Sequence, residues 1–356
     1  MSASLYPQRL SSSRLTLRAP GESDRSLWVR LHRDASLYRY APYSIAPSDS
    51  AASEQFDEVL AHWSEHGFGY HVVDRAAEPD GSPEAIGVGG LRAQGAGELN
   101  LYYRFSAAAQ GQGYAREAAR AWVAAGVEHL DGTVIAVAKE HNLASVRTAL
   151  AAGLGRAGTR RDPGEPVDAA PSVLLRAPRI SVLRQEGFTH ATRRDILDLW
   201  CRVTRAGGAV GFLPSESREA HAAALAAHED QMRAGLATAV LVRDPDAPGD
   251  PAVAGLGWWV QEPVTLLAHR RTAYRVMTDP DKRGRNLGRI LMAAMHRAAR
   301  DEDVEIVTLG VRGGMGLEDF YARCGYREVG RLAGGIRVAP GDDRDDITMA
   351  RRLSHG

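Results

Sequence analysis

The sequence has little of what marks a secreted, metal-binding or membrane protein. Its only cysteines are Cys201 and Cys324, too few for a disulfide framework and without the CxxC spacing of a zinc site. It has no run of roughly 18 apolar residues, and its N-terminus lacks the apolar core of a signal peptide. We therefore expect a soluble cytoplasmic protein with no metal and no membrane partner.

The chain also has no net charge. Lys plus Arg and Asp plus Glu both number 44, so the formal charge at pH 7 is zero. Since no basic block alternates with aromatic residues, we expect no nucleic-acid partner. A length of 356 residues with 44% apolar content is enough for two domains with ordinary cores.

Three landmarks recur in the same order in both halves: a Gly-containing apolar strand, a Gly-rich loop that opens a helix, and a helix that ends on glycine. Their offsets are 168, 173 and 172 residues, and such agreement indicates a duplicated unit. We expect domains at residues 1–178 and 179–356. The landmarks lie at Gly87, Gln110 and Gly153 in the first half and at Gly255, Arg283 and Gly325 in the second.

The pattern within each half predicts a mixed α/β (α+β) fold. The expected elements are, in chain order, an N-terminal strand, one or two helices, an antiparallel run of strands, the loop with its helix, another strand, the Gly-ended helix and a final strand pair. Residues 158–178 are rich in Pro, Gly and charge, which favours a boundary there. Within them, "SVLLR" is expected to be the last strand of the first half.

The two Gly-rich loops are candidate phosphate sites. A glycine turn at a helix N-terminus presents unpaired N–H groups and the positive end of the helix dipole, which suit pyrophosphate. Neither loop matches the GxxxxGK[ST] P-loop, and neither belongs to the early βαβ unit of a Rossmann loop. Asn286 stands where the second loop would have its third glycine, but Asn tolerates a left-handed backbone, so we expect the turn to survive.

Both loops fit the pattern [QR]xxGx[GA] between a strand and a helix. Residues 110–115, "QGQGYA", match it fully, and residues 283–288, "RGRNLG", match it except at Asn286. This resembles the acyl-CoA loop of the GNAT superfamily of N-acyltransferases, whose Gly-ended helix follows each loop after 43 or 42 residues. The resemblance covers essentially the whole chain as two tandem GNAT domains, each a mostly antiparallel sheet flanked by helices.

The first half is similar to the branch that acetylates ribosomal-protein N-termini and small amines, through "HWSEHGFGYHVV" and "NLASVRTALAAGL". The resemblance implies acetyl-CoA, or another short acyl-CoA, as co-substrate. The residues that it implies for acyl-CoA binding are Gln110, Gly111, Gln112, Gly113, Tyr114, Ala115 and Asn142 in the first half, and Val276, Thr278, Arg283, Gly284, Arg285, Asn286, Leu287 and Gly288 in the second.

Amine acylation needs a base for the ammonium and an acid for the departing thiolate. In the first half, Glu98 begins the strand that leads to the loop and is either a general base or a strand-end carboxylate paired with Arg. Asn142 and Ser145 match the NxxS of the ribosomal-type branch, which implies contact with the pantetheine arm or thiol, although Ser145 could instead cap a helix. Ala149 occupies the place of the tyrosine acid found elsewhere in the superfamily.

The second half has a candidate acid but no carboxylate at the position of Glu98, the reverse of the first half. Tyr321 lies four residues before Gly325, where many GNAT domains place the phenol that protonates the thiolate, although it could be a core tyrosine. Arg271 and Thr272 stand opposite Glu98, so a base must come from elsewhere or be water. The neighbouring carboxylates that could serve, each also explained as a surface charge, are Glu216, Glu219 and Asp281.

Other motifs carry less weight. The stretch 62–66, "HWSEH", fits the HxxEH zinc-protease motif, but it lacks a distal third ligand and is better explained by two exposed helix histidines. Cys201 has no His or Asn partners in sequence and is interpreted as a buried apolar residue. Trp258 and Trp259 either line a wall of the acceptor site or belong to the core.

Together these features predict an N-acyltransferase that moves an acetyl group from acetyl-CoA to a primary amine of a small molecule by direct attack, acting as a monomer or homodimer. Three alternatives stay open. One or both halves could be non-catalytic acyl-CoA-binding or scaffold modules. The enzyme could acetylate a protein N-terminus. An amino-acid ligase on the related tRNA-dependent fold is less favoured, because the neutral composition does not support a basic groove.

Overall fold

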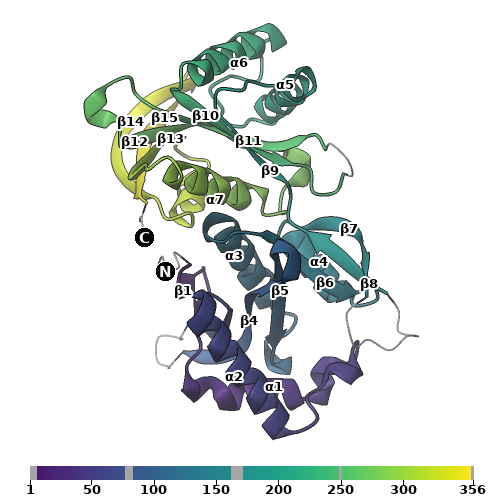
Figure 1. The fold of residues 1–356 in the computed structure, drawn as a ribbon. Helices are drawn as coiled ribbons and strands as arrows, with labels where there is room; N and C mark the ends of the chain where they lie inside the picture. The colour runs from purple at the N-terminus through teal and green to yellow at the C-terminus, as the bar shows by residue number, and fades with distance from the viewer. Residues whose placement is uncertain (1–5, 77–82, 162–170, 248–250, 354–356) are drawn as a thin grey trace. The chain divides into compact units, whose positions relative to one another are not determined.

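The computed structural model describes residues 6–76, 83–161, 171–247 and 251–353. Its described residues form two compact units, divided between Ala177 and Pro178, one residue before the expected boundary. Figure 1 shows that each unit is a sheet with helices on both faces. The fold class is therefore the predicted mixed α/β architecture.

The N-terminal unit is built around an eight-stranded sheet in the order β1-β2-β3-β4-β5-β6-β8-β7. In its described part, all neighbours are antiparallel except the parallel pair β5 and β6. The predicted strand "SVLLR" is β8. The elements are β1 (Arg9–Ser11), β2 (Leu15–Arg18), α1 (Arg25–Arg33), α2 (Asp49–His66), β3 (Tyr70–Arg75), β4 (Glu84–Gln94), β5 (Glu98–Phe105), α3 (Tyr114–His129), β6 (Thr133–Lys139), α4 (Leu143–Ala151), β7 (Gly155–Arg160) and β8 (Ser172–Arg176).

The C-terminal unit repeats this plan with seven strands in the order β14-β15-β13-β12-β11-β10-β9. Again one pair, β12 with β13, is parallel in the described residues. The elements are β9 (Ile180–Leu183), α5 (His190–Arg205), α6 (Arg218–Arg233), β10 (Ala237–Arg243), β11 (Val253–Val260), β12 (Arg270–Thr278), α7 (Leu287–Arg300), β13 (Ile306–Arg312), α8 (Leu317–Ala322), β14 (Arg327–Ala339) and β15 (Asp342–Arg352).

Strand alternation sends side chains to two different helix layers. In the N-terminal unit, Val88 packs with α1 and α2, whereas a side chain at the adjacent Gly89 would meet Trp122 of α3 at 2.8 Å. In the C-terminal unit, Trp258 lies in the α5–α6 core, and Trp259 donates to Met295 O of α7 at 2.6 Å. Both tryptophans are fully buried and so belong to the core rather than to a wall of the acceptor site.

Local sequence signals start and end the helix α2. Ser48 caps α2, accepting from Ala51 N, and Gly67 ends that helix with φ of 71°. No helix in the described part of the chain is long and apolar enough to cross a membrane.

Candidate functional site

The first Gly-rich loop turns β5 into α3 through two left-handed residues. Gly111 has φ of 76°, and Gly113, the N-cap of α3, has φ of 80°. The first helical hydrogen bond runs from Glu117 N to Gly113 O at 3.1 Å. The N–H groups of residues 114–116 therefore have no intrahelical acceptor, and with the helix dipole they make this end of α3 attractive to an anion.

Glu117 braces this loop from outside. Its carboxylate accepts from Ser12 Oγ at 2.8 Å, from Arg14 N at 2.9 Å and from Arg14 Nε at 2.7 Å. Burial alone raises the pKa of Glu117, but these hydrogen bonds outweigh it and the pKa is lowered. Arg14 also donates to Gln112 O at 3.1 Å and lies over the ring of Tyr114 at 4.6 Å. The N-terminal turn thus holds the loop in shape.

A cavity of about 500 Å³ opens beside the loop, within the range of small-molecule sites. Among the predicted residues, Gln112 is not part of its lining, and its side-chain amide donates instead to Ala108 O at 2.8 Å. The structure brings together, in the lining, the predicted residues Gln110, Gly111, Gly113, Tyr114, Ala115, Asn142 and Ser145.

The sheet splays at the level of this cavity. β5 and β6 pair only through Glu98↔Thr133, Leu99↔Val134 and Asn100↔Ile135. Residues 101–105 stay paired with β4 on the other side. In this described stretch, the edge of β5 that faces β6 is therefore open, and an extended ligand can pair with its backbone groups.

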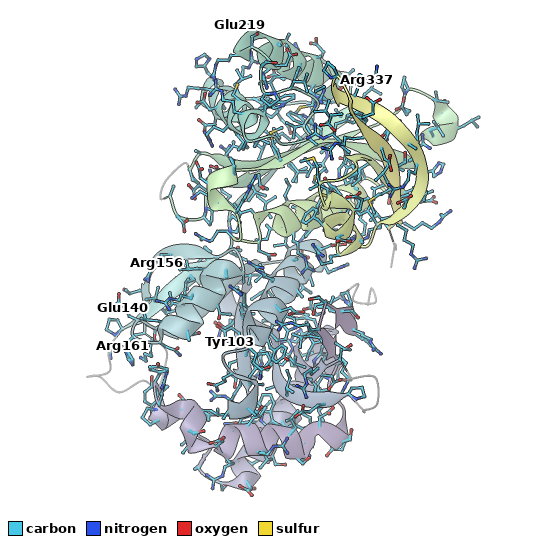
Figure 2. All side chains as sticks on the ribbon, turned by 180° about the vertical axis from the view of Figure 1, so that it is seen from behind. Tyr103, Glu140, Arg156, Arg161, Glu219 and Arg337 are labelled. Atoms are coloured by element: carbon cyan, nitrogen blue, oxygen red, sulfur yellow. The ribbon has the colours of Figure 1, made fainter. Side chains whose placement is uncertain are left out.

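Asn142 and Ser145 have distinct positions at the start of α4. Asn142 is the N-cap, and its Oδ1 accepts from Ser145 N at 3.2 Å, so the interpretation of Ser145 as the helix cap is wrong. The hydroxyl of Ser145 instead lies 3.0 Å from Tyr103 Oη, which also donates to Ser145 O at 3.2 Å. Burial raises the pKa of Tyr103, so its phenol stays protonated at neutral pH. Figure 2 labels Tyr103 on β5.

The charges that line the cavity have one sign. Four arginines contribute, namely Arg39, Arg104, Arg116 and Arg147, and none of the described lining residues is Asp, Glu or His. No carboxylate of the described residues lies within 4.0 Å of these four guanidinium groups. A cationic cavity of this kind favours ligands that carry negative charge.

Glu98 lies away from this cavity. It is the first residue of β5, whereas the loop follows the last residue of that strand. Its two carboxylate oxygens pair with Arg160 and Arg176, each at 2.7 Å. The Arg160 hydrogen bond and the charges of both arginines lower the pKa of Glu98, which makes it a weak base. Glu98 is thus a strand-end carboxylate paired with arginines, which was the alternative interpretation of the sequence, and we do not propose it as the base.

The second loop keeps the backbone of the first. Gly284 has φ of 80°, and Asn286, the N-cap of α7, has φ of 59°, as expected for an Asn that replaces glycine. Val276 and Thr278 lie on β12, on the part of that strand beyond its parallel pairing with β13, which ends at Ala273. The loop residues Arg283, Gly284, Arg285, Asn286, Leu287 and Gly288 thus follow an open strand, as in the first unit.

The charges at the second loop differ from those at the first. Arg285 pairs with Asp246 at 2.9 Å, and Lys282 pairs with Asp244 at 2.9 Å and Asp246 at 3.4 Å. The Arg285 hydrogen bond, with the charges of Arg285 and Lys282, lowers the pKa of Asp246, so this carboxylate is ionised at neutral pH. Two acidic side chains beside the loop oppose the binding of phosphate.

Tyr321 lies on α8 and is 9% exposed. Its ring contacts Phe320 and Tyr326, with centroids 5.1 and 5.8 Å away, and burial raises its pKa. Phe320 in turn lies close to the second loop, since a side chain at Gly288 would meet it at 3.2 Å. The base candidates Glu216, Glu219 and Asp281 are all exposed. Figure 2 shows Glu219 at the outer end of α6, where it is an ordinary surface charge.

The HxxEH motif is structural. His62 is 7% exposed rather than exposed as expected, because its Nδ1 contacts Phe68 O at 2.8 Å and its Nε2 accepts from Ala93 N at 3.3 Å. The described residues contain no His, Cys, Asp and Glu group that could hold a metal. Cys201 is buried, as predicted.

Sequence reasoning missed Tyr103 and Arg104, which both line the cavity. The dipeptide Tyr-Arg also occurs in the second half as Tyr274 and Arg275, but Tyr274 lies nine residues before its loop and Tyr103 seven, so the duplication did not mark the pair. Alternating residues on a strand reach opposite faces, so only the tertiary structure shows that both enter one cavity.

Comparison with known proteins supports the two-unit interpretation. A model of the acetyltransferase (GNAT) domain matches residues 14–154, and a second model of such a domain matches residues 251–328. A search of curated proteins finds no match.

Several solved structures are similar to parts of the chain. A GnaT-family acetyltransferase from Bordetella pertussis is 21% identical, with a TM-score of 0.40, over 48% of this chain and 99% of that one. Ribosomal-protein-alanine N-acetyltransferase from Brucella melitensis is 20% identical, with a TM-score of 0.39, over 49% and 99%. The acetyltransferase yncA from Salmonella typhimurium, solved with acetyl-CoA, is 12% identical, with a TM-score of 0.39, over 50% and 96%.

Each half of the chain contains one family match, and each match includes the Gly-rich loop of its half. The chain therefore belongs to the GNAT acetyltransferase family and carries two of its domains in tandem.

Proposed function

We propose that the N-terminal domain transfers the acetyl group of acetyl-CoA to a primary amine of a small molecule by direct attack. The observation that carries this proposal is that one cavity, of about 500 Å³, is lined by the Gly-rich loop, the N-terminus of α3, Asn142 and Ser145. In this scheme acetyl-CoA supplies an activated thioester. We further propose that the protein works as a cytoplasmic monomer or homodimer without a nucleic-acid or membrane partner.

The residues present fit such a co-substrate. The N–H groups of residues 114–116 and the side chain of Arg116 suit the pyrophosphate. The open edge of β5 at residues 101–105 suits the amides of an extended pantetheine arm. Ser145 and Tyr103, whose hydroxyls lie 3.0 Å apart in the same lining, are the hydroxyls that we propose for the sulfur.

Ser145 and Tyr103 are proposed to act as a two-hydroxyl relay. When the amine nitrogen bonds to the thioester carbon, the C–S bond breaks and the sulfur leaves as a thiolate. The hydroxyl of Ser145 donates to that sulfur, and the hydroxyl of Tyr103, 3.0 Å from Ser145 Oγ, turns from Ser145 O to Ser145 Oγ and replaces the proton. Burial raises the pKa of Tyr103, so the phenol holds its proton at neutral pH and regains it from water after each turnover.

The amine must arrive, or become, neutral before it attacks. Since the described lining of the cavity holds no Asp, Glu or His, we propose that water carries the ammonium proton to solvent. The rate at subsaturating amine should then rise with pH toward the pKa of the acceptor amine.

The acceptor side of the cavity favours a small molecule over a protein N-terminus. The segment after α1 reaches the turn before α4, where the rings of Tyr40 and His141 are 5.4 Å apart and Lys139 lies 5.8 Å from the ring centroid of Tyr43. These contacts join the two segments beside the cavity, which Tyr40 lines, and we propose that they limit the size of the acceptor.

For the C-terminal domain we propose a weaker acyl-CoA site that is not required for acetyl transfer by the N-terminal domain. The left-handed turn at Asn286 supports binding, whereas Asp244 and Asp246 oppose it. Tyr321 is the residue through which this domain could still protonate a thiolate.

The test has two parts. Calorimetric titration with CoA should show one tight and one weaker site, and mass spectrometry of an amine panel incubated with acetyl-CoA should show products heavier by one acetyl group. Absence of CoA binding in both domains would overturn the proposal.

A further inference from the structure

Arg104 is held rigidly at the acceptor side of the cavity without a carboxylate partner. Its Nη1 donates to Leu37 O at 3.1 Å, and its guanidinium carbon lies 3.7 Å from the ring centroid of Tyr38. Its Nε donates to Tyr102 Oη at 2.8 Å. Among the described residues no hydrogen bond to its Nη2 is found, so part of the guanidinium fork remains for a ligand.

A neutral histidine fixes this arrangement. Nδ1 of His32 lies 2.8 Å from Trp28 O, and since a carbonyl only accepts, Nδ1 carries the proton. Nε2 of His32 therefore accepts from Tyr102 Oη at 2.8 Å, which leaves that oxygen as acceptor for Arg104 Nε. Burial lowers the pKa of His32 to about 4, so His32 is neutral at neutral pH and these hydrogen bonds keep their directions.

Arg104 is separated from the phosphate end of the cavity. Arg116 lies in the first turn of α3, beside the Gly-rich loop, and belongs with the pyrophosphate. Tyr103 and Arg104 are adjacent on β5 and so point to opposite faces, with Tyr103 toward Ser145 of α4 and Arg104 toward the segment after α1. Both side chains line the same cavity, so a small molecule can reach the reacting sulfur and Arg104 together.

A partly buried guanidinium without an anionic neighbour is costly, and a carboxylate is the group that complements its planar fork best. We propose that the acceptor of the N-terminal domain is an amine that also carries a carboxylate, of the amino-acid class, and that Arg104 binds this carboxylate. This inference rests on the proposed acetyl transfer and names its substrate class.

The test compares matched acceptors. Each α- and ω-amino acid of a panel is assayed against its own carboxamide, which keeps the amine and the length but removes the charge. Thiol release from acetyl-CoA gives kcat/KM, and calorimetry on the CoA-saturated protein gives acceptor affinity. We expect the best acid to exceed its amide by on the order of 10- to 100-fold in both.

Two variants connect this preference to Arg104. R104Q should lower the kcat/KM and the affinity of the acid to those of its amide. R104K keeps the charge but loses the planar fork, so it should retain part of the preference for the acid. The matched control is R116Q, which should raise the KM for acetyl-CoA and leave the ratio of acid to amide unchanged.

The outcomes separate this inference from the proposed function. If acids and amides react and bind equally, or if R104Q lowers both to the same extent, the inference is wrong while acetyl transfer stands. If no amino acid binds to the CoA-saturated protein, the substrate class is also wrong. Failure of CoA itself to bind would instead remove the proposed function.

Discussion

The two Gly-rich loops have nearly the same backbone and different surroundings. The paired φ values are 76° at Gly111 and 80° at Gly284, then 80° at Gly113 and 59° at Asn286. Replacement of the last glycine has therefore not broken the turn. The shape of such a loop alone does not determine whether it holds a phosphate, because the nearby charges also contribute.

Those charges favour the first loop. It is braced by Glu117 and adjoins a cavity whose only charged lining residues in the described structure are arginines. The second loop has basic residues of its own, but Arg285 is paired with Asp246. The position of Glu117 in α3 corresponds to Ile290 in α7, which is buried, so the second loop lacks that brace.

The Tyr-Arg dipeptides on β5 and β12, which lie two positions apart when the loops are aligned, also have different surroundings. Tyr103 reaches Ser145, whereas Tyr274 is 40% exposed. The reason is local: Arg275 has φ of 52°, and the pairing of β11 with β12 shifts at this point. Arg104 and Arg275 both donate to the segment after the first helix of their units, at Leu37 O and Val210 O, but Arg275 packs its guanidinium 5.4 Å from the ring centroids of Trp200 and Phe212.

The largest expected effect is on the proton relay of the first half. Ser145→Ala should lower kcat on the order of 100-fold with little change in the KM for acetyl-CoA, because the leaving sulfur loses its donor. Tyr103→Phe should lower it on the order of 10-fold, since Ser145 remains. The matched variant of the second half, Tyr321→Phe, should change the rate of thiol release less than about twofold. A larger loss in Tyr321→Phe than in Ser145→Ala would place catalysis in the C-terminal domain.

Next in size is strain in the first loop. Gly113→Val should weaken tight CoA binding on the order of 30-fold, since a β-branched residue at φ of 80° costs about 2 kcal/mol and displaces the N–H groups. Gly284→Val introduces the same strain in the second loop, where φ is also 80°. Calorimetry should show that Gly284→Val leaves the tight site intact. Loss of the tight site in Gly284→Val alone would reverse the assignment of the two loops.

The brace of the first loop should make stability depend on pH. The pKa of Glu117 is lowered in the folded state, so its contribution is present above the unfolded pKa of about 4.3 and is lost as pH falls through the folded value. Glu117→Gln should reduce the free energy of unfolding by about 1–2 kcal/mol at neutral pH, and this difference should shrink below about pH 4.

Chemical denaturation between neutral and acidic pH measures this effect. The control is Glu140→Gln, since Glu140 is exposed and lies at the outside of the N-terminal unit (Figure 2). A penalty for Glu117→Gln that stays constant down to the lowest pH would show that the ionised carboxylate is not the source of the stability.

The acidic residues at the second loop provide a gain-of-binding test. In a Gly113→Val background, Asp246→Asn should strengthen CoA binding at the remaining site about fivefold, because a nearby carboxylate opposes phosphate by about 1 kcal/mol. Raising the salt concentration should reduce the difference between the two proteins. If Asp246→Asn instead weakens binding, then Asp246 orients Arg285 for the ligand rather than competing with it.

Features coded within a short stretch were predictable from the sequence. The duplication, both turns and the NxxS stretch at Asn142 and Ser145 depend on neighbouring residues, and Asn286 takes the left-handed backbone as expected. Features made by distant strands were not predictable. Glu98 meets Arg176, 78 positions away in sequence, only because β5, β6 and β8 are neighbours in the sheet.

The smallest expected effect comes from exchanging the two residues that differ at the end of each loop. Gly113→Asn and Asn286→Gly should each change CoA affinity no more than about threefold, since Asn reaches the left-handed region at a cost of under about 0.7 kcal/mol. Gly113→Asn should be slightly unfavourable, because it adds a side chain near the guanidinium groups of Arg14 and Arg116, which lie 3.6 and 3.8 Å from a Cβ at this position. Calorimetry on both variants separates backbone shape from charge. If Asn286→Gly alone raised the second site to the affinity of the first, the turn residue rather than the pair of aspartates would set the difference between the halves.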